Sequence, residues 1–425
     1  MQKFLSNGIW INSWLMLAVA IGVSGARLPA ERIVLADPGV DGPVAEQVRH
    51  WQEKIRGGQR DRTQSFERLG WAFVNLGRLR SDAGFFKLAE LSADAMDAQG
   101  EATPGADLLR GHAWLQQHRF ADAENLARRL VADRGAPKDY ALLADATMEQ
   151  GKLAESVAAC QELVNRQPGL EASVRIAQLR WLHGDLPGAI QAMAMANRVG
   201  GNLPVETTAW TQVRLGHFQL LAGEIDQAQR WADQVLDTHP DYAAAWLLRG
   251  QVELATGNTE GAVVALDRAA ALNPLPGYVW WQAEALRVAS QLDRATEIEA
   301  TMAKHGAAAD PRTLALFLAT RRSGTDRAVT LATAELHERA DAYTYDALAW
   351  SQWSAGNIEA AADSIERALA TGLSDGRVWL HAGVIAAANG APDQAATYLA
   401  RANDFATGLM PSERALLAAA TSATN

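Results

Sequence analysis

The stretch that decides the fold reads TTAWTQVRLGHFQLLAGEIDQAQRWADQVLDTHP over residues 207–240 and DYAAAWLLRGQVELATGNTEGAVVALDRAAALNP over residues 241–274. Four positions of the first segment recur 34 residues later in the second: Gly216, Gly223, Ala228 and Pro240 correspond to Gly250, Gly257, Ala262 and Pro274. A fixed period of 34 residues is typical of an array of helix–turn–helix units. Each unit is too thin to bury its own apolar face, so it stacks on its neighbours.

The second copy shows how one unit is built. Trp246, Gly250 and Leu254 are spaced as one stripe of an α-helix. A glycine inside a helix costs about 1 kcal/mol relative to alanine, so Gly250 predicts that a second helix crosses close by. Gly257 suits the left-handed conformation that ends a helix. Pro274 ends the second helix, because its ring cannot continue the backbone hydrogen bonds.

This pattern resembles the tetratricopeptide repeat (TPR) family. The matching run is Trp246, Gly250, Gly257, Ala262, Ala269 and Pro274. The second copy in register makes a chance match improbable, and weaker copies extend the resemblance from about residue 63 to 402. The resemblance implies an all-α fold, a right-handed α-solenoid of about ten stacked helix–turn–helix repeats with capping helices at both ends.

Composition shifts divide the chain further. Residues 27–42 carry several Pro and Gly residues and predict an extended leader. Residues 44–55 predict a capping helix, and Pro411 opens a second one that runs to about residue 420. The loose connection at 199–207 predicts two blocks, 44–200 and 205–420, and the repeat at about 309–340 is the most degenerate.

The N-terminus predicts export. Residues 1–26 form a signal peptide, in which Lys3 gives the positive start, residues 14–23 the apolar core, and Ser24-Gly25-Ala26 the small residues before cleavage after Ala26. The alternative is an uncleaved anchor in the inner membrane formed by residues 9–23. Either way we expect a bacterial envelope or secreted protein, periplasmic if the signal is cleaved and the protein retained.

Charge and cysteine content exclude several classes. The formal net charge of −10 argues against a nucleic-acid partner, which would favour a basic surface. Cys160 is the only cysteine, so neither an intrachain disulfide nor a cysteine-based metal cluster is expected. It falls on the second helix of a repeat at a small apolar position, which predicts a buried structural thiol.

Signals for catalysis are missing from the sequence. It contains no glycine-rich phosphate loop, no G-x-S-x-G elbow and no H-E-x-x-H spacing among its nine histidines. His337-Glu338 lacks the second histidine of a zinc motif. We therefore expect a protein that is not an enzyme, with no catalytic residue, no cofactor and no metal site.

The resemblance also implies which side chains face the concave side of the array, because the first helix of each repeat lines that side. The central positions are Trp71, His112, Asp145, Gln178, His217, Gln251, Glu284 and Trp350. With the flanking positions added, the predicted partner-binding groove contains Trp350, Trp353, Trp280, Arg287, His217, Trp181 and Trp71. The alternative for each Trp, and for His217, is packing between neighbouring helices.

Two functions of different classes fit this reading. The first is an exported scaffold that binds a protein segment in an aromatic-lined groove and helps assemble an envelope or secreted complex. The alternative keeps the solenoid but binds a small apolar molecule or a glycan on the Trp-rich wall. A weaker third option is an α/α-toroid enzyme. The family's clamp for C-terminal carboxylates is not expected, because no Asn occupies the central positions.

Overall fold

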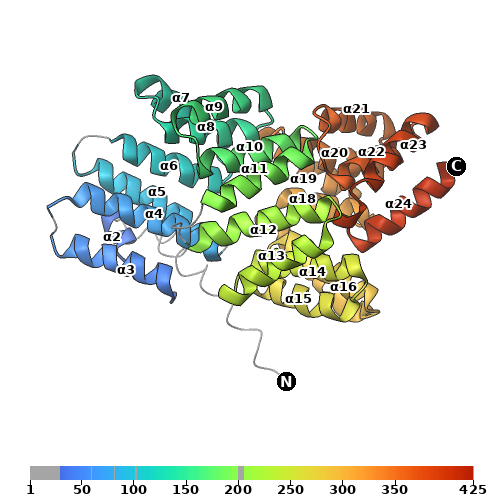
Figure 1. Cartoon of the computed structure of the whole chain (residues 1–425), viewed down its shortest axis with the longest axis horizontal. Helices are drawn as coiled ribbons and strands as arrows, with labels where there is room; N and C mark the ends of the chain where they lie inside the picture. The colour runs from blue at the N-terminus through green and yellow to red at the C-terminus, as the bar shows by residue number, and fades with distance from the viewer. Residues whose placement is uncertain (1–28, 59, 81, 101–102, 200–204, 425) are drawn as a thin grey trace. The chain divides into compact units, whose positions relative to one another are not determined.

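The structure is a computed structural model that describes residues 29–58, 60–80, 82–100, 103–199 and 205–424. All regular secondary structure in these residues is helical (Figure 1). The all-α prediction is therefore confirmed. The predicted signal peptide, residues 1–26, lies outside the described residues.

Ten consecutive helix pairs follow a preceding helix and correspond to the ten repeats of the sequence pattern. The preceding helix is α3 (Pro43–Arg56), and the pairs are α4 (Arg62–Arg80) with α5 (Ala83–Asp97), α6 (Pro104–Gln116) with α7 (Phe120–Asp133), α8 (Pro137–Glu149) with α9 (Leu153–Arg166), α10 (Leu170–Leu182) with α11 (Leu186–Val199), α12 (Val205–Leu221) with α13 (Ile225–Thr238), α14 (Ala243–Thr256) with α15 (Thr259–Leu272), α16 (Pro276–Val288) with α17 (Leu292–His305), α18 (Pro311–Thr320) with α19 (Thr325–Glu338), α20 (Ala342–Ser354) with α21 (Ile358–Leu369), and α22 (Gly376–Ala388) with α23 (Pro392–Asn403). The helix α24 (Pro411–Thr424) comes last.

Glycines set the geometry of a pair as the sequence predicts. A Cβ atom at Gly250 would lie 2.4 Å from Cγ of Leu266, so the missing side chain lets α15 cross close to α14. Gly257 ends α14 in the left-handed conformation, at φ +80°. At the turns that lack this glycine, Ser290 and Arg322 adopt φ of 60° and 49° instead. These turns therefore keep the left-handed conformation even though the glycine is absent from their sequence.

The chain forms two compact units, residues 1–143 and 144–425. This division differs from the predicted one at 200–205. The helices α11 and α12 pack on each other on either side of the loose connection, and the boundary predicted there stays a prediction. The N-terminal unit has its own apolar core around Phe66, Phe73 and Phe86, and Cys160 in the C-terminal unit is buried as expected.

The described part of the predicted leader is not extended throughout. It contains a short helix, α2 (Ala30–Val34), which packs on α5. Val34 is fully buried, and Nε2 of Gln52 on α3 donates to the carbonyl oxygens of Val34 and Ala36 at 2.8 and 2.7 Å. The Pro and Gly content suggested an extended segment, but burial of Val34 between Pro29 and Pro38 favours a packed turn of helix.

Candidate partner-binding surface

The TPR resemblance places the first helices of the repeats on the inner face, and in the C-terminal unit later parts of the same chain contact these helices. Trp181 on α10 is 6% exposed. Its Nε1 donates to the carbonyl oxygen of Ser374 at 2.7 Å, and the amide of Ser374 donates back to the carbonyl oxygen of Trp181 at 3.1 Å. The ring of Tyr343 lies 5.6 Å from that of Trp181. The segment between α21 and α22 therefore closes over the end of α10.

Trp350 and Trp353 lie together, as their spacing predicts. Trp350 is 2% exposed, and its ring stacks on Trp353 at 4.2 Å and on His381 at 3.9 Å between centroids. Its Nε1 donates to Oγ1 of Thr320 at 2.9 Å. His381 is itself buried, 2.8 Å from a carboxylate oxygen of Asp346. These contacts join α18, α20 and α22, so Trp350 packs between helices and only half-buried Trp353 reaches the surface.

Trp280 and Arg287 on α16 are engaged within the chain as well. Trp280 is 1% exposed, and the guanidinium of Arg377 lies 5.3 Å from its ring. Arg287 donates two hydrogen bonds to the carboxylate of Glu299, at 2.8 and 2.5 Å, on the second helix of its own repeat. The hydrogen bonds to that carboxylate raise the pKa of Arg287. The guanidinium is thus held by its own repeat rather than presented alone to a partner.

The side chains of His217 and Trp71 are both partly exposed to solvent. His217 on α12 is half-buried. Burial lowers its pKa to about 3, and the nearby positive charge of Arg214 acts in the same direction. The imidazole is therefore neutral at physiological pH. Trp71 on α4, in the N-terminal unit, is half-buried and meets the ring of His112 edge-on at 5.1 Å.

A segment outside the repeats lies against the predicted groove of α12, α14 and α16. We call residues 405–414 the C-terminal strap; it comprises the short 3-10 turn η2 (Ala406–Gly408) and the start of α24. Oγ1 of Thr407 donates to the carbonyl oxygen of Leu220 at 2.6 Å. The amide and hydroxyl of Ser412 donate to the two carboxylate oxygens of Glu284, at 3.0 and 2.8 Å. Glu284, a predicted central groove position, thus holds the chain's own strap.

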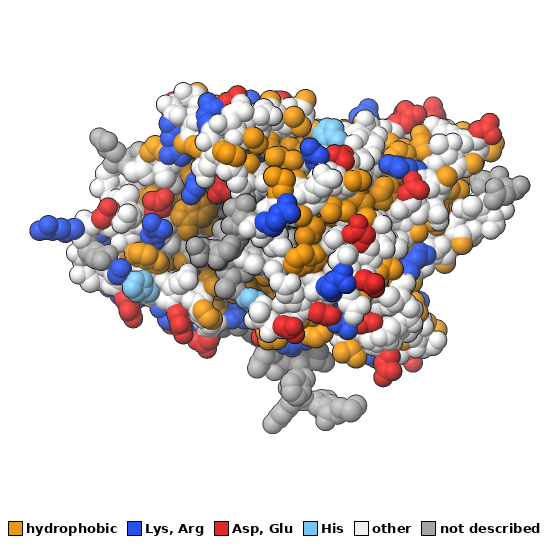
Figure 2. Space-filling model, viewed as in Figure 1, with side chains coloured by type: hydrophobic (Ala, Val, Ile, Leu, Met, Phe, Trp, Pro, Cys, Tyr) orange, Lys and Arg blue, Asp and Glu red, His pale blue; other side chains and the backbone are white. Residues whose placement is uncertain are grey.

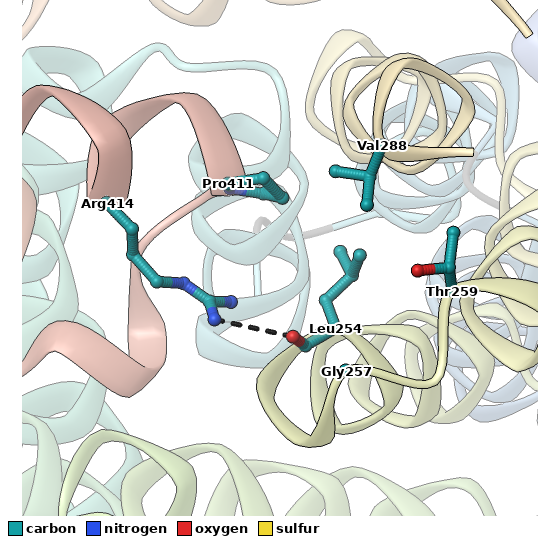
Figure 3. A pocket seen from close by; sticks show the side chains of 6 residues that line it. All are labelled: Leu254, Gly257, Thr259, Val288, Pro411 and Arg414. Carbon is teal, nitrogen blue, oxygen red and sulfur yellow. Dashed lines mark hydrogen bonds between the residues drawn. The ribbon is translucent and has the colours of Figure 1, made fainter. Parts of the chain in front are cut away.

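The strap fits closely at one point and leaves a gap at another. A Cβ atom at Gly408 would lie 2.3 Å from Cδ2 of Leu221, so a glycine permits the contact. Further along, a pocket of about 250 Å³ lies between the strap and the helices α14 to α16 (Figure 3). Its lining consists of Leu254, Gly257, Thr259, Val288, Pro411 and Arg414.

Arg414 bridges that gap with an incomplete set of hydrogen bonds. Its Nη1 donates to the carbonyl oxygen of Leu254 at 3.3 Å, the contact drawn in Figure 3, and its Nε to that of Leu409 at 3.0 Å. Its Nη2 is buried without a partner among the described residues. Burial lowers the pKa of Arg414, and the negative charge of Glu413 opposes this only in part. The contact between the strap and the inner helices therefore leaves one hydrogen-bond donor without an acceptor among the described residues.

Hydrophobic side chains also reach the surface elsewhere. Figure 2 shows them in separate groups between basic and acidic side chains. The large apolar residues that are exposed by 40% or more are Leu79, Val157, Met195, Trp210, Val264, Val288 and Leu292. They are spread over several repeats, as single exposed apolar residues commonly are.

Two further searches cover the described residues only. Among them, no group of three or more His, Cys, Asp or Glu side chains is arranged to hold a metal ion. None of the described helices combines the length and the apolar character needed to cross a bilayer.

Solved structures with similar architecture include two TPR proteins. A thermophilic TPR protein of Thermus thermophilus shares 20% identity, with 44% of this chain and 99% of that chain covered and a TM-score of 0.37. The human IFIT1 dimer with PPP-AAAA shares 12% identity over 88% and 93%, with a TM-score of 0.48. A TPR protein of Parabacteroides merdae shares 16% over 60% and 98%, with a TM-score of 0.33. At these values none bears on what this chain binds.

Family membership follows from the sequence model rather than from these structures. No curated protein matches the chain. The model of the tetratricopeptide repeat matches residues 108–170, 141–198, 215–276 and 347–408, which together span just over half of the chain. The matched segments coincide with helix pairs between α6 and α23. This chain belongs to the tetratricopeptide repeat family.

Proposed function

We propose that this protein is a non-enzymatic, exported scaffold that binds a protein segment on the inner face of its repeats and helps assemble an envelope or secreted complex. TPR repeats generally mediate protein binding. The observation that carries the proposal for this chain is that the inner helices already hold a non-repeat segment. Glu284, at a predicted groove position, accepts two hydrogen bonds from Ser412 of the strap.

The geometry favours a peptide over a small molecule. Ligand pockets commonly enclose about 300–1,000 Å³, whereas the pocket at the strap (Figure 3) is smaller, about 250 Å³. The contacts that hold the strap are spread over the first helices of three successive repeats, α12, α14 and α16. A surface of that kind suits an extended segment, which makes several separate contacts along its length.

Affinity purification of the full-length protein from its own cells, followed by mass spectrometry and titration with the purified partner, tests the proposal. The half-buried groove residues Trp71 and His217 are the ones to change, because the buried ones would alter folding as well. We expect Trp71→Ala or His217→Ala to weaken binding at least tenfold. Val264→Ala, at a side chain 63% exposed on a second helix, is the control and leaves binding unchanged. Unchanged binding in both groove variants would reject the groove.

Export is a separate part of the proposal and rests on residues 1–26. The charged start, apolar core and small residues before position 27 support cleavage after Ala26. Intact-mass measurement of the protein from the periplasmic fraction and from the medium tests this. A mass that begins at Arg27 agrees with the proposal. A full-length mass in the membrane fraction supports the anchor formed by residues 9–23 instead, and a full-length mass in the cytoplasm rejects export.

A further inference from the structure

We propose that the C-terminal strap occupies the partner site of the C-terminal unit, and that the partner competes with it by presenting a segment of the same chemistry. The inference rests on the proposed function, because it names where a protein segment binds and what that segment contains. It also gives the strap a role as a built-in competitor that lowers the affinity of the site for weak partners.

The inner helices offer the strap a row of hydrogen-bond acceptors. Carbonyl groups in the last turn of a helix lack intrahelical partners. The carbonyl oxygen of Leu254 on α14 accepts from the strap, whereas that of Leu220 on α12 accepts both from the strap and from the amide of Gly223 at 3.0 Å. On α16 the acceptor is the carboxylate of Glu284, which is 1% exposed. The row therefore runs across three repeats and ends at a buried carboxylate whose Oε1 also accepts a hydrogen bond from Arg321 at 2.8 Å.

The strap meets this row with three kinds of donor. Thr407 supplies a hydroxyl to Leu220, Arg414 a guanidinium to Leu254, and Ser412 both an amide and a hydroxyl to Glu284. A buried acceptor left unpaired costs about 1–3 kcal/mol, so a segment that replaces the strap is expected to donate to the carbonyl of Leu254 and to Oε2 of Glu284, which the strap pairs. The partner segment is therefore rich in hydroxyl and basic side chains, and the net charge of −10 on this chain favours such a segment.

Apolar contacts fix the register of the strap. Phe405 is 6% exposed and packs in one cluster with Phe218 and Leu221. Met410 is 2% exposed and belongs to the core around α16 and α18. Between them Gly408 lies against Leu221 with no room for a side chain. The partner segment accordingly carries a bulky apolar residue on each side of a small one.

The pocket between the strap and the inner helices is where an incoming segment can begin to displace the strap. The pocket in Figure 3 separates Pro411 and Arg414 from Val288 and Thr259, and Val288 is 46% exposed at its edge. The Nη2 group of Arg414 has no partner among the described residues. Because this end of the strap is the least completely paired, displacement begins there at the lowest cost.

The test uses the full-length protein and a fluorescent synthetic peptide of residues 404–416, with binding followed by anisotropy. Gly408→Leu dislodges the strap, because the new side chain overlaps Leu221. Gly277→Leu is the matched control, since a Cβ atom at Gly277 has no heavy atom within 4 Å. We expect Gly408→Leu to bind the peptide at least tenfold more tightly than the wild type, and Gly277→Leu to bind it as the wild type does.

Two further measurements keep the test decisive. Adding Glu284→Gln to Gly408→Leu must weaken peptide binding at least tenfold, which places the peptide on α16 rather than elsewhere. If Gly408→Leu loses its helical circular dichroism, Ser412→Ala replaces it, with a smaller gain of about threefold from the loss of one hydroxyl contact. Equal peptide binding by the wild type and by the folded strap variants overturns the inference.

The natural partner separates this inference from the proposed function. A partner protein that binds the wild type and Gly408→Leu with equal affinity leaves the scaffold function intact and removes the strap as competitor. The converse result is also possible. If the peptide binds Gly408→Leu through Glu284 but the protein captures no partner from its own cells, the strap site is supported and the scaffold function is rejected.

Discussion

A methyl group at position 250 tests whether each repeat depends on the close approach of its two helices. Gly250 lies inside α14, and a Cβ atom there would be 2.4 Å from Cγ and 2.6 Å from Cδ2 of Leu266. Carbon atoms in favourable contact are about 3.5–4.0 Å apart, so the overlap is on the order of 1 Å. Leu266 is fully buried and cannot swing into solvent to relieve it.

The size of the effect follows from two opposing terms. Alanine inside a helix is favoured over glycine by about 1 kcal/mol, while overpacking a core costs about 1–3 kcal/mol. Gly250→Ala should therefore lower the free energy of unfolding by up to about 2 kcal/mol. A Cβ atom at Gly277 on α16 would have no atom within 4 Å, so Gly277→Ala gains the helix propensity of alanine without any overpacking. The two variants should differ by about 1–3 kcal/mol.

Urea denaturation followed by far-ultraviolet circular dichroism measures this difference. Long repeat arrays can unfold in more than one step, so the midpoints are compared only between transitions of equal slope. A double variant with Leu266→Ala adds a check, because the two changes should be less harmful together than their sum if the side chains overlap. If Gly250→Ala proves as stable as Gly277→Ala, the reasoning about close helix crossing is refuted.

Three other changes give measurable outcomes. Ser290→Gly should stabilise the protein by about 0.5–1 kcal/mol in the same denaturation assay, because Ser290 adopts φ 60° and a left-handed non-glycine residue costs about 1–2 kcal/mol, partly offset by the flexibility of glycine in the unfolded chain. Trp350→Ala should destabilise by about 3–5 kcal/mol, since Trp350 is 2% exposed and stacks on two rings; a loss below 1 kcal/mol would contradict its packing role. The pKa of His217, about 3 in the folded state and 6.5 ordinarily, means that its contribution to stability is present above pH 6.5 and is lost as the pH falls towards 3. Wild-type protein should therefore lose more stability than His217→Gln between pH 7 and pH 5, and equal losses would contradict the lowered pKa.

The sequence predicted well whatever depends on neighbouring repeats. The glycine at position 250 indicated a close helix crossing, and Leu266 lies where that crossing requires. The period of 34 residues placed all ten helix pairs, including the pair formed by α18 and α19 in which the signature is weakest. Such features follow from local backbone preference and from packing within a repeat or onto the next one. The residues responsible for both therefore recur at the repeat period of the sequence.

The covering of the inner face could not be predicted in the same way. Trp181 and Trp350 do lie on first helices, but their exposure depends on residues far away in the chain, such as Ser374, which is hydrogen-bonded to Trp181 across 193 positions. Ser374 and Gly408 belong to connections between or after repeats, where no period applies. Whether these segments meet α10 and α12 depends on the summed rotation of many repeats, a quantity that no single repeat encodes.

The glycines of the turns show this limit most directly. In the sequence, Gly151, Gly184 and Gly257 occupy equivalent places, and all three adopt positive φ. A Cβ atom at Gly257 would meet nothing within 4 Å, so this glycine serves backbone conformation alone. At Gly151 and Gly184, however, a Cβ atom would lie 2.2 and 2.5 Å from the carbonyl oxygens of Ala340 and Gly372. In two repeats the turn glycine therefore has a second role, because its missing side chain lets a distant segment of the chain approach closely. Only the curvature of the assembled unit distinguishes the two cases, because the local pattern around each glycine is satisfied either way.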